Sequence, residues 1–222
     1  MRFSVITIFP DLIRNFLNYG LLEKAIRSGL VDVDVYDLRE FSRNKHRKVD
    51  DRPLGGGPGM VLMPDPLFRA VEFIRTRQPG RVILFSAAGR VLEQEKIKSL
   101  AHAEHLILIC GRYEGVDQRV IDNLVDEEIS LGEYVLMGGE IAAEALLESV
   151  SRMIPGVIGN PESVRGDSFY HEDQVAFPQY TQPRFYRDWA VPELLLSGNH
   201  KQIEQWRLKN RKKRRKENEK NS

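Results

Sequence analysis

A short, unbroken apolar run at residues 106–110 (LILIC) ends abruptly at a glycine, and this pattern limits the fold more than any other in the chain. A strand that is apolar on both faces needs cover on both, which is typical of a parallel sheet between helices. Residues 81–85 repeat the pattern, and residues 3–9 have the length of a strand. Segments with helical spacing separate these runs. The residues therefore predict an α/β fold, with a mostly parallel sheet and helices on both faces.

Further elements follow from local patterns. We expect a helix that begins with Asp11 as its cap, and helices over residues 64–77 and 93–101. Residues 31–35 alternate as a half-buried strand. A long helix is expected to follow a pair of glycines. One small, apolar face of this helix suits close packing against a sheet or a second subunit, and it consists of Ile141, Ala145, Leu146, Ser149, Val150 and Met153.

The composition excludes two classes of protein. Of the 222 residues, 41% are hydrophobic and 29% charged, which is typical of a soluble globular protein. No apolar run approaches the ~20 residues that a membrane-spanning helix needs, so no membrane partner is expected. The single cysteine, Cys110, excludes an internal disulfide framework and favours the reducing cytoplasm. Because it ends a buried strand, we interpret Cys110 as a packing residue rather than a nucleophile.

The charged residues are unevenly distributed, although the formal net charge is only +1. Residues 39–48 form one basic cluster and residues 207–216 form another. Clusters of this kind are expected on a protein that binds a polyanion such as RNA. Two ordinary solvated faces would give the same pattern, so the charges alone leave both interpretations open.

Glycines recur in turns between residues 105 and 153. Gly111 and Gly115 bracket an Arg-Tyr-Glu sequence, and glycine lets the backbone approach a ligand where a Cβ atom would intrude. Neither phosphate-binding glycine spacing occurs, and the region is rich in carboxylates: Glu114, Asp126, Glu127, Glu128, Glu133 and Glu140. An acidic pocket of this kind favours a cationic small molecule. Tight turns between strands and helices would explain the glycines equally well.

Six sequence strings together resemble one known family. CGRYEG (110–115), SLGEYVL (130–136) and GGE (138–140) are similar to the cofactor-binding core of bacterial tRNA (guanine-N1)-methyltransferases, the TrmD family, which belongs to the trefoil-knotted SPOUT methyltransferases. DDRPLGGGPGM (50–60), SRMIPGVIG (151–159) and DSF (167–169) extend the match. It covers nearly the whole chain through Leu208, with the strings in the family's order.

The resemblance implies a fold and a domain organisation. Pattern alone would suggest an ordinary doubly wound sheet, because true knots are essentially absent from the usual topologies. The family implies instead that the C-terminal part of the sheet is threaded into a trefoil knot whose turns hold the methyl donor. Residues 1–159 would form the SPOUT methyltransferase domain. Residues 160–187 would be a linker carrying the catalytic aspartate, and residues 188–222 a small helical tRNA-binding domain with a basic tail.

The resemblance also implies the reaction. A methyl group would pass from S-adenosylmethionine to N1 of the guanine next to the anticodon on its 3′ side, position 37 of tRNA. Asp167 matches the general base that removes the N1 proton, and Arg152 matches the cation that stabilises charge on O6. Matching motif to motif, the donor site comprises Gly111, Leu131, Gly132, Glu133, Tyr134, Val135 and Leu136, and is further lined by Ser86, Tyr113, Glu114, Gly138 and Gly139.

The family implies a homodimer in which one chain supplies the donor pocket and the other Asp167, with the tRNA anticodon stem-loop as partner. Magnesium dependence is also implied, although no ligand set is visible. No metal site is predicted, and the five histidines lack the spacing of a zinc site. Residues 175–183 (VAFPQYTQP) depart from the family's usual acidic and basic pattern, which puts the contacts made there in doubt.

Three alternatives differ from this assignment in their target nucleotide, their activity or their fold. Another SPOUT RNA methyltransferase acting on a different nucleotide is the nearest, and the GGGPGM loop with Arg152 and Asp167 argues against it. A noncatalytic RNA-binding protein would need only the basic clusters. A Rossmann-type methyltransferase would have a glycine-rich turn after its first strand, where this chain has Phe9, Pro10 and Asp11.

Overall fold

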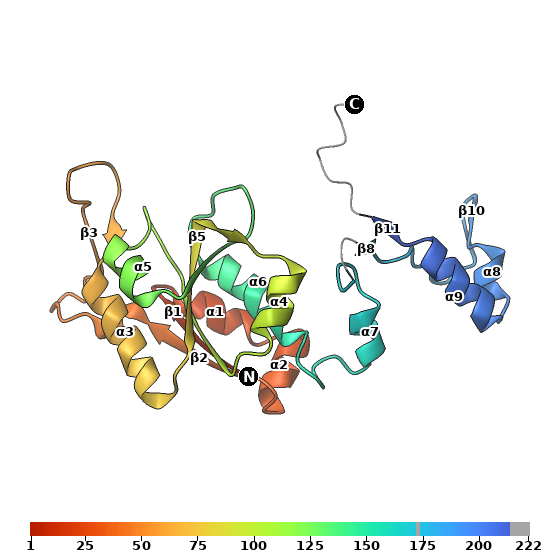
Figure 1. Cartoon of the computed structure of the whole chain (residues 1–222), viewed down its shortest axis with the longest axis horizontal. Helices are drawn as coiled ribbons and strands as arrows, with labels where there is room; N and C mark the ends of the chain where they lie inside the picture. The colour runs from red at the N-terminus through yellow and green to blue at the C-terminus, as the bar shows by residue number, and fades with distance from the viewer. Residues whose placement is uncertain (172–173, 214–222) are drawn as a thin grey trace. The chain divides into compact units, whose positions relative to one another are not determined.

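The computed structural model describes residues 1–171 and 174–213. The chain divides into two compact units, Met1–Gly159 and Asn160–Ser222. Figure 1 shows both units along the chain's colour gradient, and each is described by itself below.

The first unit is built around a five-stranded sheet. Its strands are β1 (Arg2–Thr7), β2 (Asp32–Asp37), β5 (Arg81–Val91), β6 (His105–Ile109) and β7 (Glu127–Ser130). They lie in the order β2-β1-β6-β5-β7, and every neighbouring pair is parallel. The predicted α/β fold with a parallel sheet is confirmed. The knot implied by the resemblance stays a prediction.

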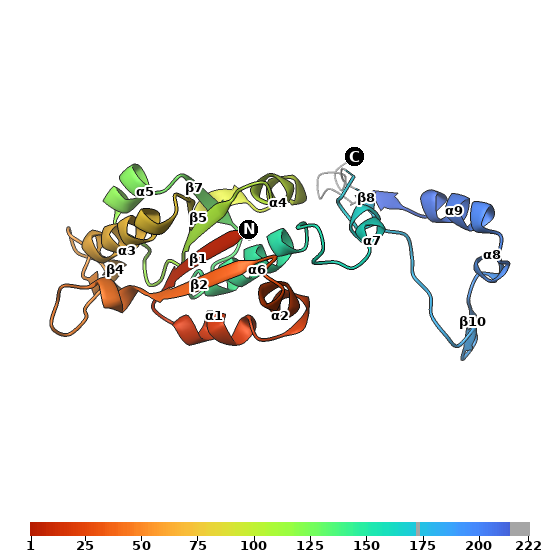
Figure 2. The same cartoon turned by 90° about the horizontal axis from the view of Figure 1, so that it is seen from below.

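Helices cover both faces of this sheet, as Figure 2 shows. One face packs against α1 (Pro10–Phe16), α2 (Gly20–Arg27), α4 (Gln94–Leu100) and α6 (Glu140–Ser151), and the other against α3 (Pro64–Arg77) and α5 (Gln118–Leu124). Successive strand residues alternate between the two cores, because side chains in a strand point to opposite faces. Val5 and Ile83 belong to the first core, whereas Ile6 and Leu84 belong to the second. Fully burying each such side chain contributes about 1.5–3 kcal/mol.

β5 is longer than the sequence predicted. The predicted strand ended at Phe85, but β5 continues to Val91 after its pairing with β7 shifts between Phe85 and Arg90. At Gly89 an added Cβ atom would lie 2.5 Å from the backbone nitrogen of Ile129, so only glycine allows this close approach. Residues 86–88 bulge out between the two paired stretches, and a bulge of this kind redirects side chains.

Two predicted details of the helices were wrong. Phe9, not Asp11, is the N-cap of α1, and Asp11 lies in the first turn, where its charge complements the helix dipole. The predicted small face of α6 also divides. Leu146 and Val150 face the sheet with Ala142, Ala143 and Leu147, whereas Ile141 is 56% exposed and Ala145 is also exposed. The apolar residues of α6 that cover the sheet form a wider stripe than the predicted face. This stripe lies on a side of the helix that is rotated from the predicted face.

The segment between β2 and α3 holds little regular structure. A 3-10 turn, η1 (Leu38–Phe41), is capped by the Asp37 carboxylate, which accepts a hydrogen bond from the Arg39 backbone N–H. A short pair of strands follows, β3 (Asp50–Asp51) and β4 (Val61–Leu62). The glycine-rich loop lies between these two strands.

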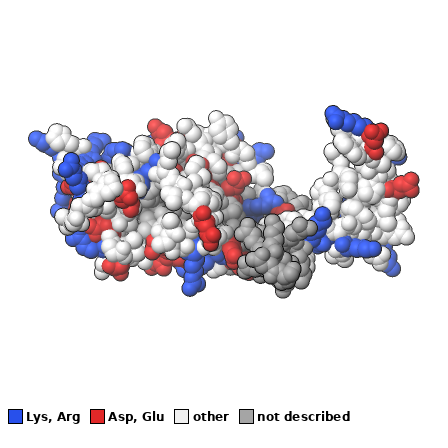
Figure 3. All heavy atoms as spheres, turned by 90° about the horizontal axis from the view of Figure 1, so that it is seen from above, with Lys and Arg blue, Asp and Glu red and all other residues white. Residues whose placement is uncertain are grey.

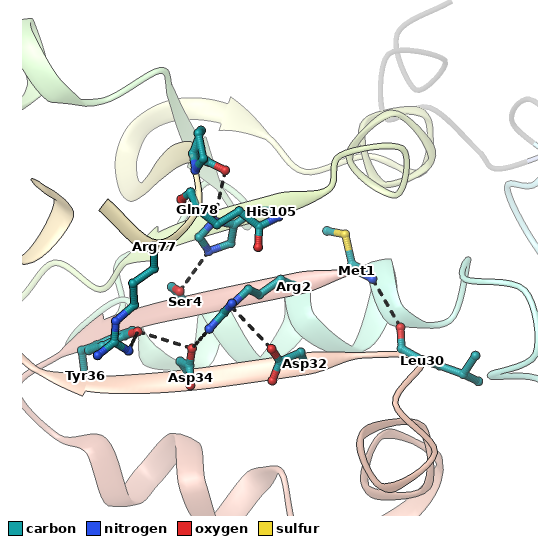
Figure 4. A network of polar contacts seen from close by, with 11 residues as sticks. Met1, Arg2, Ser4, Leu30, Asp32, Asp34, Tyr36, Arg77, Gln78 and His105 are labelled. Carbon is teal, nitrogen blue, oxygen red and sulfur yellow. Dashed lines mark hydrogen bonds and ion pairs between the residues drawn. The ribbon is translucent and has the colours of Figure 1, made fainter. Parts of the chain in front are cut away.

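Polar side chains form a network near the amino end of the sheet (Figure 4). In β6, the His105 Nε2 atom lies 2.9 Å from the Ser4 hydroxyl, and Nδ1 lies 3.2 Å from the carbonyl oxygens of Gln78 and Pro79. Burial lowers the pKa of His105. The ring is therefore neutral, with its proton on Nδ1, because carbonyl oxygens only accept. Arg2 forms ion pairs with two aspartates of β2.

The second unit contains short elements only. They are α7 (Pro161–Arg165), β8 (Gln174–Val175), β9 (Phe185–Tyr186), β10 (Trp189–Ala190), α8 (Glu193–Leu196), α9 (His200–Lys209) and β11 (Lys212–Lys213). β9 pairs with β10 and β8 with β11, both antiparallel. Among its described residues, no hydrophobic side chain is fully buried. The part of this unit that the structure describes therefore has no hydrophobic core of its own.

Candidate functional site

A cavity of about 510 Å³ opens beside residues 84–88 of β5 and at the carboxyl ends of β6 and β7. Three loops enclose it: the bulge of residues 86–88, the first donor loop (residues 111–115) after β6, and the second donor loop (residues 131–139) after β7. Its volume lies within the range of small-molecule sites, and ligands of parallel α/β sheets bind at this edge. The fold thus places the glycine-rich turns together around one cavity.

Most of the predicted donor-site residues line this cavity. They are Ser86, Gly111, Tyr113, Glu114, Leu131, Tyr134, Val135, Leu136, Gly138 and Gly139. Gly132 and Glu133 do not line it. Gly132 shapes the cavity indirectly, through Tyr134. An added Cβ atom on Gly132 would lie 2.7 Å from the Tyr134 ring, which does line the cavity. That glycine allows the ring to fold back over its own loop.

Two glycines let the donor loops touch. The Gly139 N–H donates to the Gly111 carbonyl at 2.8 Å, and an added Cβ atom on Gly139 would lie 2.8 Å from the Cα atom of Cys110. A Cβ atom on Gly138 would overlap the Arg112 side chain. The two loops therefore approach each other as closely as backbone allows, which fixes the width of the cavity between them.

The glycine-rich segment supports the first donor loop from behind, a contact that the sequence did not predict. Glu114 N–H donates to the Met60 carbonyl at 3.0 Å, and Leu62 N–H donates to the Gly115 carbonyl at 3.0 Å. Gly59 has φ +79°, and an added Cβ atom there would lie 2.5 Å from the Glu114 carboxylate. The resemblance covers residues 50–60, but nothing in their spacing signals which loop they pair with.

Arg112, Val116, Gln118, Ile121 and Met137 also line the cavity and were missed. Val116 and Ile121 are apolar residues that recur at helical spacing, a pattern that does not show which site they face. Tyr113 has φ +61°, which is rare for a residue with a side chain. This backbone conformation places strain in the turn that lines the cavity.

The cavity is less acidic than the sequence suggested. Ion pairs neutralise three of the six carboxylates: Glu140 pairs with Arg112, Glu127 with Arg81 and Lys96, and Asp126 with Arg75. Only Glu114 among the six lines the cavity. The predicted acidic surroundings therefore reduce to one carboxylate at the wall, because sequence counts charges without showing their partners.

Cys110 is 2% exposed at the end of the β6 run. Burial raises the pKa of its thiol well above the ordinary value, and the nearby Glu140 carboxylate adds to this. The sulfur is therefore a neutral thiol rather than a thiolate nucleophile. The structure supports the interpretation of Cys110 as a packing residue.

Arg152 lies at the other end of α6, where it is the C-cap residue and is exposed. It lines a second cavity, also about 510 Å³, together with Phe16, Tyr19 and Leu21 from the α1–α2 region. It does not line the donor cavity. The Ser151 hydroxyl beside it is buried with no hydrogen-bond partner.

Asp167 lies in the second unit and is half-buried. It follows α7, and its N–H donates to the Val164 carbonyl at 3.3 Å. The next two residues close against β8: Ser168 Oγ accepts from the Ala176 N–H at 3.0 Å, and Phe169 N–H donates to the Gln174 carbonyl at 2.7 Å. The Asp-Ser-Phe motif is therefore a defined turn rather than an open strand.

Within residues 1–171 and 174–213, no group of three or more His, Cys, Asp or Glu side chains is placed to hold a metal ion. Over the same part of the chain, no helix has the length and apolar character needed to cross a membrane.

The chain is similar to proteins of one family over almost its whole length. The family model described as tRNA (Guanine-1)-methyltransferase TrmD matches residues 1–221. A tRNA (guanine-N(1)-)-methyltransferase of Moorella thermoacetica is 50% identical over 212 residues, which cover 93% of this chain and 84% of the relative. The enzyme of the same name from Staphylococcus epidermidis is 46% identical over 207 residues, with coverage of 93% and 84%.

A solved structure agrees with these sequence matches. The crystal structure of tRNA (m1G37) methyltransferase from Aquifex aeolicus superposes with a TM-score of 0.79 at 44% identity, covering 94% of this chain and 88% of that one. Family model, relatives and solved structure all match the chain that carries the glycine-lined cavity described above. The chain therefore belongs to the tRNA (guanine-1)-methyltransferase family, TrmD.

Proposed function

We propose that this chain is a methyltransferase that moves a methyl group from S-adenosylmethionine to N1 of guanine 37 in tRNA. The family and the names of the relatives support the reaction, and the name of the Aquifex aeolicus enzyme supports the position. The observation that carries the proposal is the cavity described above, since it is lined by residues of three strings shared with the family: 110–115, 130–136 and 138–140. A SPOUT enzyme for another nucleotide is not favoured by any of these findings.

The cavity fits the donor. When bound, S-adenosylmethionine supplies an electrophilic methyl group on a sulfonium cation. The backbone at Gly111, Gly138 and Gly139 can approach a flat, polar ligand without Cβ atoms in the way. Tyr134 offers an aromatic face to a cation, and Glu114 offers a negative charge at the wall. Leu131, Val135 and Leu136 supply apolar contacts.

Two side chains perform the chemistry on the guanine. The ring N1 is a poor nucleophile while protonated, so a base must remove its proton, and we assign that step to the Asp167 carboxylate. As the proton leaves, negative charge develops on O6. Arg152 stabilises this charge with its permanently charged guanidinium. The proton ends on Asp167. The N1 lone pair forms the new bond to the methyl carbon while the carbon–sulfur bond breaks, and the electron pair of that bond goes to sulfur, so that S-adenosylhomocysteine leaves.

We propose that Arg152 and Asp167 act on the donor held by a second copy of the chain. Helix α6 separates the donor cavity from Arg152, since Gly139 lies at its N-terminus and Arg152 at its C-terminus. They are 13 residue steps apart, and a rise of 1.5 Å per residue separates their backbones by about 20 Å. This is farther than an arginine side chain reaches, which supports a cation supplied by a second chain.

The surface around Arg152 suits a homodimer. Ile141, Ala145, Glu148 and Arg152 follow each other at helical spacing on the exposed side of α6. α6 packs beside α1 and α2, where Tyr19 is 76% exposed. Leu12 and Leu21 are also exposed large apolar residues there. A two-fold pair would cover this apolar surface and form both composite sites together.

The basic residues suit the RNA. Figure 3 shows Lys and Arg side chains gathered at one end of the first unit, and Arg43, Lys45 and Arg47 in the 39–48 segment are exposed. The described part of the second unit has no hydrophobic core of its own, so apolar cover from the RNA or from a partner subunit would stabilise it. We propose that it binds the anticodon stem-loop. Arg214, Arg215 and Lys216 of the predicted basic tail lie outside the described residues.

Magnesium has no visible ligand set among the described residues, so we assign no step to a metal. Because tRNA is the substrate, we propose the cytoplasm as the compartment.

A subunit-mixing experiment tests the composite site. Gly111 lines the donor cavity and has room for a side chain, since an added Cβ atom would lie 3.4 Å from its nearest neighbour. G111L should therefore fill the cavity without displacing backbone, and D167N should remove the base. Each variant alone is expected to be inactive. After subunit exchange, half the dimers carry one intact site of two, so about a quarter of full activity should return.

The matched control is a mixture of R152A and D167N. If both residues serve the partner's cavity, every site in that mixture lacks one of them, and no activity returns. Activity in this control would show that Arg152 serves the cavity of its own chain. An inactive G111L and D167N mixture with heterodimers present would place the whole site within one chain.

A further inference from the structure

A buried carboxylate joins three elements behind the donor cavity. Glu140 is 1% exposed, and it is the first residue of α6. Its Oε1 atom accepts a hydrogen bond from the Thr7 hydroxyl at 2.6 Å. Its Oε2 atom accepts from Arg112, with 2.8 Å to Nε and 2.8 Å to Nη2. Both oxygens of the carboxylate are therefore used, and no solvent reaches it.

The three residues come from separate parts of the chain. Thr7 ends β1, Arg112 belongs to the first donor loop, and Glu140 follows the second. Phe9 adds to the arrangement. Its N–H donates to the Thr7 hydroxyl at 2.9 Å, and its ring lies 4.6 Å from the centre of the Arg112 guanidinium. The Thr7 hydroxyl thus accepts one hydrogen bond and donates the other, which fixes its orientation.

Arg112 in turn holds the second donor loop. Its Nη1 atom donates to the Met137 carbonyl at 3.3 Å, and its side chain lies against Gly138. The backbone of Arg112 also forms a bridge with Gly138. The side chain is only 18% exposed, so its charge needs the Glu140 carboxylate for compensation. The position of both loops therefore depends on this ion pair.

We propose that Thr7 and Glu140 are positioning residues for donor binding. They orient the Arg112 side chain so that it holds the two donor loops at the spacing that shapes the cavity. Neither Thr7 nor Glu140 lines the cavity, so they act through Arg112 and not by touching the donor. This inference rests on the proposed function, in which the cavity binds S-adenosylmethionine.

A second buried carboxylate provides a matched control. The Glu127 side chain is 12% exposed and pairs with Lys96 at 2.6 Å and Arg81 at 2.8 Å. Glu127 is the first residue of β7. Neither Glu127 nor its partners Lys96 and Arg81 line the cavity. E127Q therefore removes a paired, largely buried charge from the same sheet without touching the donor loops.

The test compares T7V, T7S, E140Q and E127Q in steady-state methylation of tRNA. T7V and E140Q should raise KM for the donor by at least about tenfold, the effect of losing a hydrogen bond to a charged group. KM for tRNA should stay within about twofold, since the loops and not the RNA surface have moved. T7S keeps the hydroxyl and should retain the donor KM of the unsubstituted chain. E127Q should lower Tm and leave both KM values unchanged.

Calorimetry with S-adenosylhomocysteine separates the inference from the function on which it rests. If the unsubstituted chain binds this product and T7V binds it equally well, Thr7 and Glu140 have no positioning role. The same conclusion follows if T7V and E127Q change Tm and donor KM alike. If the unsubstituted chain does not bind the product at all, the proposed function itself is wrong. T7V removes one hydroxyl and keeps the shape of the side chain, so it serves as the test even if E140Q does not fold.

Discussion

Substitution of Gly139 by alanine should open the donor cavity. The φ angle of Gly139 is −80°, which any residue adopts, so the backbone conformation itself allows alanine. The added Cβ atom, however, would lie 2.8 Å from the Cα atom of Cys110 and 3.0 Å from the backbone nitrogen of Gly111. Both neighbours are backbone atoms, one in Cys110 just after β6 and one in the first donor loop, and they cannot rotate away. The two loops have to separate.

The size of the effect follows from these contacts. Overpacking of this kind costs about 1–3 kcal/mol. Separation of the loops also weakens the hydrogen bond from Gly139 N–H to the Gly111 carbonyl, worth about 0.5–1.5 kcal/mol. If the closed arrangement is the one that binds the donor, a loss of about 1.5 kcal/mol weakens binding about tenfold. The lower end of both ranges is used here, because the chain relaxes partly.

Isothermal titration calorimetry with S-adenosylhomocysteine measures this loss directly, at a temperature where circular dichroism shows the variant folded. G159A is the control. Gly159 has nothing within 4 Å of an added Cβ atom, so the same substitution there should leave the Kd unchanged. A folded G139A variant that binds within twofold of the unsubstituted chain would refute the view that the contact between these loops shapes the cavity.

Three further predictions concern other parts of the chain. Burial lowers the pKa of His105, so the unfolded chain binds this proton at a higher pH than the folded chain does. The free energy of unfolding should therefore fall as the pH drops below 6.5, by up to about 1.4 kcal/mol per pH unit. Urea titrations should show that H105Q removes this slope. A double variant R43Q/R47Q should flatten the salt dependence of tRNA binding by roughly 1.4–1.8 in log–log slope and leave donor affinity unchanged in the same calorimetric assay. G132A should weaken donor binding by displacing the Tyr134 ring, and removal of that ring in a G132A/Y134A variant should add less than the two single effects combined, which a double-mutant cycle measures.

The local sequence pattern was sufficient to predict an element wherever the burial of its apolar residues determines its structure. α3 begins and ends where the helical spacing of Leu67, Val71 and Ile74 placed it, because those residues all face one core. The parallel sheet was likewise predictable from apolar runs that are buried on both faces. Boundaries were lost where a tertiary contact sets them, as at β5, whose pairing resumes past the bulge only because Gly89 admits the backbone of β7.

The candidate site could be predicted as a set of loops but not as a set of partners. The glycines of the donor loops were visible in sequence, and so was the Arg-Tyr-Glu string between two of them. Charge pairing was not visible. The sequence assigned Glu140 to the acidic pocket, yet its carboxylate is buried against Arg112 and Thr7. Thr7 lies far from both residues in the sequence. The contact of Met60 with Glu114 was hidden for the same reason, since it joins two irregular segments with no periodic pattern.

Mass mapping of methylated nucleosides tests the central claim most directly. Unmodified tRNA with guanine at position 37 is incubated with the chain and S-adenosylmethionine labelled in its methyl group, then digested and analysed by tandem mass spectrometry. The account predicts label in 1-methylguanosine at position 37, and none when that guanine is replaced by adenine. Label on N7, on a ribose oxygen or at another position of the tRNA would contradict it.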